Sequence, residues 1–161
     1  MTRFIAGVFV SVLSWSFMQG PKAGPNQEKE SAPLRLGNFS ISLTVKDIAA
    51  SRAFYEKLGL RVVSGNQAKK WLVMANETAR IGLFQGMFEK NSLTFNPGWD
   101  SEKKTLKDFD DVRDIQRVLK SKGLTLTASA DESSTGPAFV TLLDPDGNPI
   151  LIDQHVPKPK K

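Results

Sequence analysis

The sequence predicts an α+β protein built from two copies of one unit, a strand followed by a helix and three further strands. Three observations support this prediction. Apolar and polar residues alternate over residues 39–46 and again over 92–96, which is the period-two pattern of a strand with one apolar face. A segment with helical periodicity, preceded by an Asp, follows each of these strands. Three more strand candidates, separated by turn signals, follow each helix, so the chain contains an internal repeat.

The first strand candidate divides its side chains between two faces. One face carries Phe39, Ile41, Leu43 and Val45, and the other carries Ser40, Ser42, Thr44 and Lys46. The helix that follows supplies a partner for the apolar face. Its apolar side comprises Ile48, Tyr55 and Leu58, with Phe54 beside them. The face with the hydroxyl groups is then directed away from the helix, and we expect the functional residues there.

Both predicted helices have start and stop signals. Asp47 is the expected N-cap of the first helix, because its carboxylate accepts hydrogen bonds from free N–H groups of the first turn. Gly59 is expected to end that helix, since glycine tolerates a positive φ. In the second unit Asp111 is the expected N-cap, Asp114 lies in the first turn and Gly123 ends the helix. The apolar side of this second helix comprises Val112, Ile115, Val118 and Leu119.

The remaining strand candidates complete each unit. In the first unit they are residues 60–64, 71–75 and 80–85, with a turn at residues 76–78. The second unit opens with residues 92–96, whose polar face carries Ser92, Thr94 and Asn96. A polar connection with Trp99 follows and is longer than its counterpart in the first unit. Residues 124–128, 138–143 and 149–153 are the last strands, and the sequence DPDGN at 144–148 is a strong turn signal.

Charge and hydropathy divide the chain into four segments. Residues 1–20 combine a basic start with an uncharged apolar run that is short for a bilayer span of about 20 residues, which indicates a secretory signal peptide. Residues 21–33 have the composition of a flexible linker, residues 34–156 form one domain, and residues 157–161 form a basic tail. We expect export to the periplasm or the exterior, without stable membrane insertion after processing. An uncleaved leader would instead anchor the protein in the membrane.

The net charge of +5 does not indicate nucleic-acid binding. Lys and Arg nearly balance Asp and Glu within residues 34–156, and the excess positive charge lies in the leader, the linker and the tail. A nucleic-acid-binding domain would concentrate this charge on one face. The chain contains no cysteine, which excludes disulfides, thiol nucleophiles and thiolate metal sites.

Three stretches resemble the vicinal oxygen chelate superfamily, which includes glyoxalase I, bleomycin-resistance proteins, fosfomycin-resistance enzymes and extradiol dioxygenases. They are VKDIAASRAFYEKLGL at 45–60, LKSKGL at 119–124 and LLDPDGNPILIDQH at 142–155. The resemblance extends over residues 34–156. It implies that each βαβββ module forms half of a cupped mixed sheet, with the helices on the convex side and the ligand in the cup. It leaves open whether the modules pair within one chain or across a homodimer.

The positions that hold a divalent ion in metal-dependent members of this superfamily have unsuitable residues here. The resemblance places these positions at Ser40, Ser92, Leu151 and, in the last strand of the first module, near Gly82. A divalent ion prefers imidazole or carboxylate ligands. We therefore expect a protein without a metal or another cofactor. Asp153 and His155 with Gln85 are the alternative ligand set, although His155 lies beyond the ligand position and is expected at the surface or the strand end.

Other catalytic arrangements find little support in the sequence. A Ser-His-Asp triad would have to use His155, and nothing places a serine beside it. No glycine-rich loop followed by Lys-Ser or Lys-Thr is present for phosphate binding. The acidic residues around the start of the second helix are Asp108, Asp110, Asp111 and Asp114. Carboxylates interact favourably with the positive end of a helix dipole, so we expect capping there and not metal binding.

The polar faces of the two opening strands mark the expected ligand site. Its candidate residues are Ser40, Ser42, Thr44, Ser92, Thr94 and Asn96 in the cup, with Trp71, Gln85, Phe88 and Trp99 at its rim or wall. Hydroxyl and amide groups with aromatic walls suit a small organic molecule. Each tryptophan could equally belong to the core or to a contact between the modules.

Three functions are compatible with this site, and the sequence assigns no catalytic residue. The leading hypothesis is an exported, metal-free module, similar to bleomycin-resistance proteins, that binds a small hydrophobic or aromatic compound. The alternative is a metal-dependent enzyme of the glyoxalase or dioxygenase type, a lyase or oxygenase with a non-standard ligand set. A metal-independent isomerase or lyase that uses Asp153 or Gln85 is the third.

Overall fold

The computed structural model describes residues 32–160. The predicted signal peptide and all but the end of the predicted linker lie outside the described residues. Residues from Pro33 onward form one compact unit, which contains the helices and strands of the described chain. None of the helices in this part of the chain is long and apolar enough to cross a membrane.

Two βαβββ modules follow each other along the chain, as the repeat predicts. Module 1 comprises β1 (Asn38–Val45), α1 (Ile48–Lys57), β2 (Arg61–Asn66), β3 (Trp71–Ala75) and β4 (Arg80–Gln85). Module 2 comprises β5 (Ser92–Asn96), α2 (Val112–Ser121), β6 (Leu126–Ala128), β7 (Ala138–Leu143) and β8 (Pro149–Gln154). A short 3-10 helix, η1 (Gln67–Lys69), joins β2 to β3.

Most strand bounds agree with the prediction to within one residue, and two strands, β2 and β6, differ by two residues at one end for local reasons. β2 continues to Asn66, whose side chain accepts a hydrogen bond from the N–H of Lys69 at 3.2 Å and so caps η1. β6 begins only at Leu126, because Leu124 donates its N–H to the carbonyl of Leu119 at 3.1 Å and belongs to the end of α2. Such bonds to the last carbonyls are typical of a helix that ends at a glycine.

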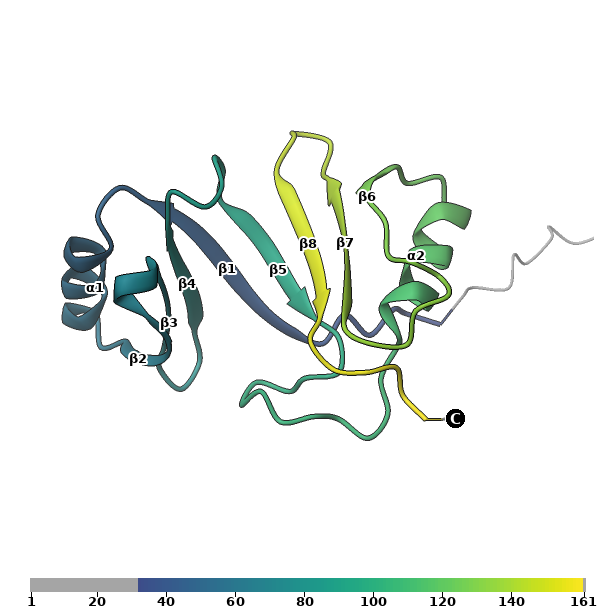
Figure 1. The fold of residues 1–161 in the computed structure, drawn as a ribbon, viewed down its shortest axis with the longest axis horizontal. Helices are drawn as coiled ribbons and strands as arrows, with labels where there is room; N and C mark the ends of the chain where they lie inside the picture. The colour runs from purple at the N-terminus through teal and green to yellow at the C-terminus, as the bar shows by residue number, and fades with distance from the viewer. Residues whose placement is uncertain (1–31, 161) are drawn as a thin grey trace, which may run out of the picture. The chain divides into compact units, whose positions relative to one another are not determined.

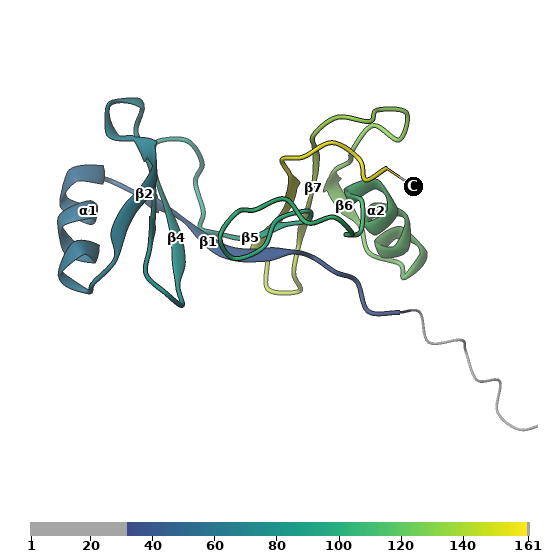
Figure 2. The same cartoon turned by 90° about the horizontal axis from the view of Figure 1, so that it is seen from below.

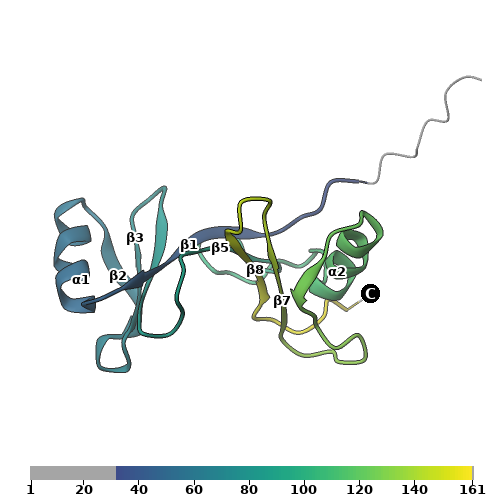
Figure 3. The ribbon, with the colours of Figure 1, turned by 90° about the horizontal axis from the view of Figure 1, so that it is seen from above.

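All the strands form one mixed sheet with the order β2-β3-β4-β1-β5-β8-β7-β6. β1 pairs with β4 and β5 pairs with β8 in parallel, while the other neighbours are antiparallel. The antiparallel pair of β1 and β5 joins the modules at the centre of the sheet (Figure 1). Viewed from below or above, this pair lies between the two halves of the sheet, with α1 and α2 on the outer sides (Figure 2, Figure 3). The predicted α+β fold, with a cupped sheet and outer helices, is confirmed.

The register of β1 and β5 shows how the modules are related. Ile41 lies opposite Leu93 at the centre of the pair. The flanking pairs are Ser40 with Thr94 and Ser42 with Ser92. Equivalent residues of the two modules therefore exchange places across an approximate two-fold axis at the central pair. The polar faces of both strands consequently lie side by side on one face of the sheet, because side chains alternate along a strand.

Each helix packs on the opposite face of its own module. The core of module 1 consists of Ile48, Leu72, Met74 and Leu83, with Leu43 and Val45 packed against it. The core of module 2 consists of Val112, Ile115, Leu119, Ala130, Val140, Leu142 and Ile152. The predicted apolar face of β1 is thus confirmed at its C-terminal half, where it contacts the core beneath α1.

Three of the residues expected between β1 and α1 lie elsewhere. Phe54 and Leu58 are exposed, at 58% and 59% of their surface. Phe54 precedes the half-buried Tyr55 and is therefore rotated away from the side of the helix that faces the sheet, and Leu58 is the C-cap residue beyond the last full turn. Phe39 lies at the start of β1, beyond the reach of α1, and its ring contacts Phe95 with a centroid distance of 5.2 Å.

The start of each helix is held in the same way. Asp47 accepts hydrogen bonds from the N–H groups of Ala49 and Ala50 at 2.8 and 3.0 Å, and Asp111 accepts one from Arg113 at 3.0 Å, as predicted for N-caps. The last residue of the last strand adds one further bond in each module. Gln85 accepts the N–H of Ile48 at 3.1 Å, and Gln154 accepts the N–H of Val112 at 2.7 Å. These bonds satisfy N–H groups that have no partner within the helix.

Candidate functional site

The concave face of the sheet encloses a cavity of about 850 Å³. β1 and β5 contribute its floor, and β3, β4, β7 and β8 contribute to its walls. The structure brings seven of the predicted residues together there. They are Ser40, Ser42, Trp71, Ser92, Thr94, Asn96 and Trp99. Phe88, expected at the rim, also lines the cavity.

The floor of the cavity is polar and largely buried. The hydroxyl groups of Ser42 and Thr94 form a hydrogen bond of 2.9 Å between the two modules. Asn96 donates from its side-chain amide to the carbonyl of Asp153 at 3.0 Å. Ser40 makes no side-chain hydrogen bond to another described residue, so its half-buried hydroxyl can donate to or accept from a ligand.

Two of the predicted site residues lie outside the cavity. The side chain of Gln85 accepts the N–H of Ile48 and so belongs to the start of α1, on the other face of the sheet. Thr44 has the orientation expected for the polar face, but its hydroxyl donates to the carbonyl of Phe88 at 2.9 Å. Its N–H donates to the side chain of Asn91 at 3.0 Å. The segment that follows β4 therefore covers Thr44, which lies beyond the last residue pair between β1 and β5.

Several cavity residues were not among the predicted binding residues, although Asp153 and His155 were named with Gln85 as an alternative metal-ligand set. Arg80 and Phe84 come from β4, and Asp153 and His155 come from the end of β8. Strand alternation would have found them, since Arg80 and Phe84 flank Gly82 at spacings of two, and Asp153 and His155 follow Leu151 at spacings of two. His155 is exposed and directly follows β8, as predicted, and it also lines the cavity. Its ring stacks on Trp99 at 4.3 Å with an interplanar angle of 11°, and its Nε2 lies 3.1 Å from Asp153 Oδ2.

The long connection between β5 and α2, residues 97–111, forms the loop below the sheet in Figure 1. Its residues Trp99 and Lys103 line the cavity. Trp99 and Thr105 form an isolated β-bridge, and Leu106 donates its N–H to the carbonyl of Gly98 at 2.8 Å. Arg80 of module 1 donates to the carbonyl of Ser101 at 3.0 Å and ties the tip of the connection to β4. These bonds hold Trp99 and Lys103 in place, and both line the cavity.

The four positions that correspond to metal ligands in the resembling superfamily all line the cavity. They are Ser40, Gly82, Ser92 and Leu151. Two hydroxyl groups, a glycine and a leucine supply neither imidazole nor carboxylate, so this donor set does not fit a divalent ion. A Cβ atom added at Gly82 would collide with the ring of Phe84. In the described part of the chain, His, Asp and Glu side chains form no cluster of three or more that could hold a metal ion.

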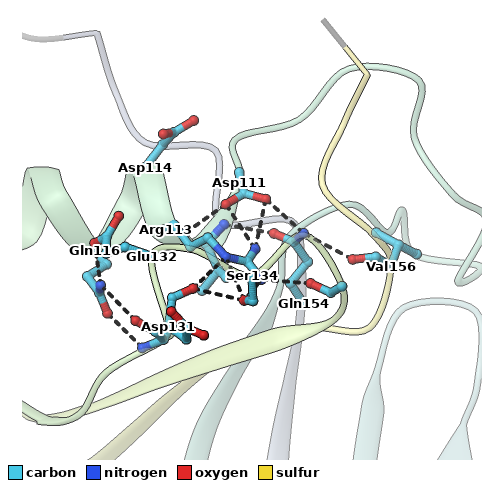
Figure 4. Close-up of polar contacts among 12 residues, drawn as sticks. Asp111, Arg113, Asp114, Gln116, Asp131, Glu132, Ser134, Gln154 and Val156 are labelled. Atoms are coloured by element: carbon cyan, nitrogen blue, oxygen red, sulfur yellow. Dashed lines mark hydrogen bonds and ion pairs between the residues drawn. The ribbon is translucent and has the colours of Figure 1, made fainter.

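A buried charged pair, Asp111 and Arg113, lies at the start of α2 (Figure 4). Arg113 pairs with Asp111 at 3.2 Å, and both side chains have no exposed surface. The guanidinium also donates to the hydroxyl of Ser134 and to the carbonyls of Asp131 and Gly136. These bonds fasten the loop before β7 to α2. The pair is therefore structural, because its donors are used within the protein.

The Asp111 carboxyl group has competing influences on its pKa. Burial raises the pKa, but the N–H and guanidinium of Arg113 and the amide of Gln154 donate hydrogen bonds to the carboxylate. With the positive charge of Arg113 these bonds outweigh the burial, so the pKa of Asp111 lies below its usual value.

Capping explains only part of the acidic cluster before α2. Asp111 caps the helix as predicted, but Asp108 and Asp110 form ion pairs with Arg35 at 2.7 and 2.8 Å. Asp114 forms an ion pair with Arg117. Asp108 and Asp110 therefore connect the segment before β1 to the segment before α2, a contact between residues far apart in the sequence.

Comparison with known proteins agrees with this fold. The family model of the Glyoxalase/Bleomycin resistance protein/Dioxygenase superfamily matches residues 38–152. The chain belongs to this superfamily, which confirms the resemblance predicted from its motifs. No curated protein matches the chain.

Solved structures resemble the chain at low sequence identity. A member of the same superfamily from Vibrio splendidus 12B01 has 14% identity and a TM-score of 0.51, over 73% of this chain and 97% of that chain. A protein described as an NAD-dependent benzaldehyde dehydrogenase from Legionella pneumophila has 18% identity and a TM-score of 0.55, over 73% and 99%. A catechol 2,3-dioxygenase has 18% identity and a TM-score of 0.51, over 78% of this chain and 43% of that chain. These similarities concern the fold alone.

Proposed function

We propose that this protein binds a small organic molecule in the cavity without a metal ion, as a binding module similar in kind to bleomycin-resistance proteins. The observation that supports this proposal is the cavity and its lining. Its volume of about 850 Å³ falls in the range of about 300–1,000 Å³ that is typical of small-molecule sites. Hydroxyl groups line the floor, and the rings of Trp71, Phe84 and Phe88 line one end, so a ligand with polar and apolar parts finds partners for both.

The aromatic end of the cavity lies where β3 begins and β4 ends. Trp71 pairs with Phe84 in the sheet register. The rings of Phe84 and Phe88 lie 5.0 Å apart. Pro149 lines the cavity from the opposite module. Burial of an apolar or aromatic group against these side chains would supply most of the binding free energy.

The residues at the positions that correspond to metal ligands in the superfamily support the metal-free part of the proposal. Ser40 and Ser92 offer hydrogen bonds to a ligand but are poor ligands for a divalent ion, and Gly82 and Leu151 offer no side-chain donor at all. Elemental analysis of the purified protein tests this part. Stoichiometric nickel, zinc, iron or manganese that survives dialysis, with an activity lost on chelation, would favour the metal-dependent enzyme instead.

A metal-independent enzyme is the second candidate, and the pair of Asp153 and His155 favours it. Both residues line the cavity, and a carboxylate that orients an imidazole is a common arrangement for a general base. Gln85 has no part in this scheme because it binds the backbone of α1. The substitution His155→Gln should leave ligand binding nearly unchanged in a binding module, whereas it would abolish proton abstraction from a bound substrate in an enzyme.

Binding of a neutral fluorescent probe tests the proposed site. We expect N-phenylnaphthylamine, an apolar aromatic amine, to bind the full chain saturably with increased fluorescence. The substitution Ser40→Leu should obstruct the cavity and weaken this binding about tenfold. The matched control Ser129→Leu makes the same change at an exposed serine that does not line the cavity. Equal binding by the two variants would show that the probe does not occupy the cavity.

Export is a separate proposal and rests on residues 1–20. Its support is the basic start, the uncharged apolar run and the polar linker that follows. The N-terminus of the protein recovered from its native host decides it. A mature chain that begins between Ser16 and Gly24 agrees with export, whereas intact Met1 in the cytosol contradicts it.

A further inference from the structure

Three cationic side chains, Arg80, Lys90 and Lys103, line the cavity without an ion-pair partner among the described residues. Lys90 follows Phe88 near the end of β4, whereas Arg80 and Lys103 lie near each other. Arg80 stands at the start of β4, and Lys103 belongs to the connection before α2. Among the described residues neither forms an ion pair, and the side chain of Arg80 donates to a neutral carbonyl, that of Ser101. The carboxylate of Asp153, which also lines the cavity, pairs with His155. Neither Asp153 nor Glu89, the other carboxylate that lines the cavity, forms an ion pair with Arg80 or Lys103, so neither cation has a carboxylate partner among the described residues.

The sheet register places the charge of Arg80 at one end of the cavity. Arg80 pairs with Ala75 at the end of β3, whereas Trp71 at the start of β3 pairs with Phe84. Arg80 precedes Gly82 by two residues on β4, and Gly82 pairs with Ser42 of the parallel strand β1. Arg80 is therefore next to the N-terminal half of β1. The cavity thus has a cationic end, where Arg80 and Lys103 lie with the ring of Trp99, and an aromatic end formed by Trp71, Phe84 and Phe88, separated by the polar floor.

The side chain of Lys103 is held toward the cationic end by its loop. Its backbone has a φ of 63°, a left-handed conformation that non-glycine residues seldom adopt. The N–H of Lys103 donates to the carbonyl of Asp100 at 3.0 Å, and the Asp100 side chain accepts the N–H groups of Glu102 and Lys104 at 2.9 Å. The Lys103 ammonium lies 5.6 Å from the centroid of Trp99, within range of a cation–π contact.

The proximity of the two cations has an energetic cost. Burial lowers the pKa of Lys103, and the nearby charge of Arg80 lowers it further. A bound anion would remove this repulsion and would accept hydrogen bonds from both groups. The space near Arg80 and Lys103 therefore favours a negative charge, and no described carboxylate pairs with either cation there.

We propose that the ligand carries an anionic group, such as a carboxylate, that binds between Arg80 and Lys103 while its apolar or aromatic body lies against Trp71, Phe84 and Phe88. The ligand class is thus an aromatic or apolar organic acid. This inference rests on the proposed function, because it assigns the ligand chemistry of the same cavity.

A pair of probes that differ in one anionic group tests this inference. Anilinonaphthalene sulfonate carries a sulfonate on the aromatic frame of N-phenylnaphthylamine. We expect the full chain to bind the sulfonate more tightly than the neutral probe, and each probe to displace the other. The substitution Lys103→Met should weaken sulfonate binding about tenfold and change neutral-probe binding less than about twofold, because a charge-assisted hydrogen bond is lost and the apolar stem is kept.

The neighbouring lysine provides the matched control. Lys104 is exposed, does not line the cavity and pairs with Glu102, so Lys104→Met should change neither affinity. Higher salt should weaken sulfonate binding to the unmodified protein and leave the neutral probe unaffected, since salt screens charges at a partly exposed site. This measurement needs no variant and stands even if Lys103→Met folds poorly.

The outcomes separate the two proposals. Saturable binding of the neutral probe with no preference for the sulfonate, or an equal effect of Lys103→Met on both probes, would overturn the anion site and leave the proposed function standing. Absence of saturable binding for both probes would overturn the proposed function and this inference together.

Discussion

In module 1 the N-cap Asp47 is exposed and accepts only backbone N–H groups, whereas the equivalent Asp111 of module 2 is buried and also pairs with Arg113. The residues at the ends of the last strands differ in the same way. Gln85 is half-buried and holds α1 alone, while Gln154 is fully buried and also donates to Asp111 and to the carbonyl of Val156. The N-cap aspartate and the strand-end glutamine therefore occur in both modules but are more deeply buried in module 2.

The helices differ accordingly. Of the residues in α1, Ile48 alone is buried. The buried residues of α2 are Val112, Arg113, Ile115, Gln116 and Leu119. Module 2 therefore has the more extensive core and polar network, and we expect it to be the more stable half. Module 1, whose helix is less buried, contributes Arg80 and the aromatic residues of β3 and β4 to the cavity.

The connections between strand and helix differ most in length. Only Lys46 and Asp47 separate β1 from α1, whereas residues 97–111 separate β5 from α2. The longer connection brings Trp99 and Lys103 to the cavity. The repeat thus produces two similar modules, and the longer connection in module 2 makes the cavity between them asymmetric.

The largest effect is expected at the buried N-cap. Asp111→Ala leaves the buried Arg113 without its partner and should lower the free energy of unfolding by about 3–5 kcal/mol. Asp47→Ala removes an exposed cap and should cost about 1 kcal/mol. Denaturant unfolding of both variants measures the difference. Equal losses would show that burial does not distinguish the two caps.

The paired glutamines should show a smaller contrast. Gln154→Ala leaves the buried N–H of Val112 and the carbonyl of Val156 without partners and should cost about 2–3 kcal/mol. Gln85→Ala removes one bond near the surface and should cost about 1 kcal/mol. It should also leave binding of N-phenylnaphthylamine unchanged, because Gln85 lies outside the cavity. A loss of binding in Gln85→Ala would contradict that placement.

Hydrogen exchange should resolve the two helices in the unmodified protein. Amides of α1 should exchange through openings that require about 1 kcal/mol less than those of α2, because α1 buries fewer side chains. Exchange measured by mass spectrometry on peptides from each helix gives this comparison. Equal protection would indicate that the two modules open as one cooperative unit.

Acid should weaken module 2. Hydrogen bonds from Asn148 lower the pKa of Asp144, and the bonds from Arg113 and Gln154 outweigh burial to lower that of Asp111. A carboxyl group with a lowered pKa in the folded state stabilises the fold above its unfolded pKa, near 3.8, and this contribution is lost as the pH falls through the folded value. The free energy of unfolding should therefore fall below pH 3.8, with a shallower slope in Asp111→Asn. Identical slopes would exclude Asp111 as a source of this dependence.

Local sequence signals predicted the strands, the helices and their N-caps well. Alternation located β1 and β5 and the faces of their side chains, since the period of a strand depends only on the backbone. Asp47 and Asp111 were found as N-caps because a cap acts within one turn of its helix. The failures concern contacts that local periodicity does not define, such as the exposed Phe54 and Leu58.

By itself, then, the sequence determined the two-module α+β fold, the superfamily and the polar floor of the cavity, because these depend on periodicity, caps and motifs within short segments. Only the tertiary structure decided which side chains meet across the cavity. The side chain of Gln85 accepts a hydrogen bond from α1, and His155 stacks on Trp99. Lys103 lines the same cavity as Arg80 of the other module. Contacts between distant segments depend on register and on the path of the long connection, and neither is encoded in a local pattern.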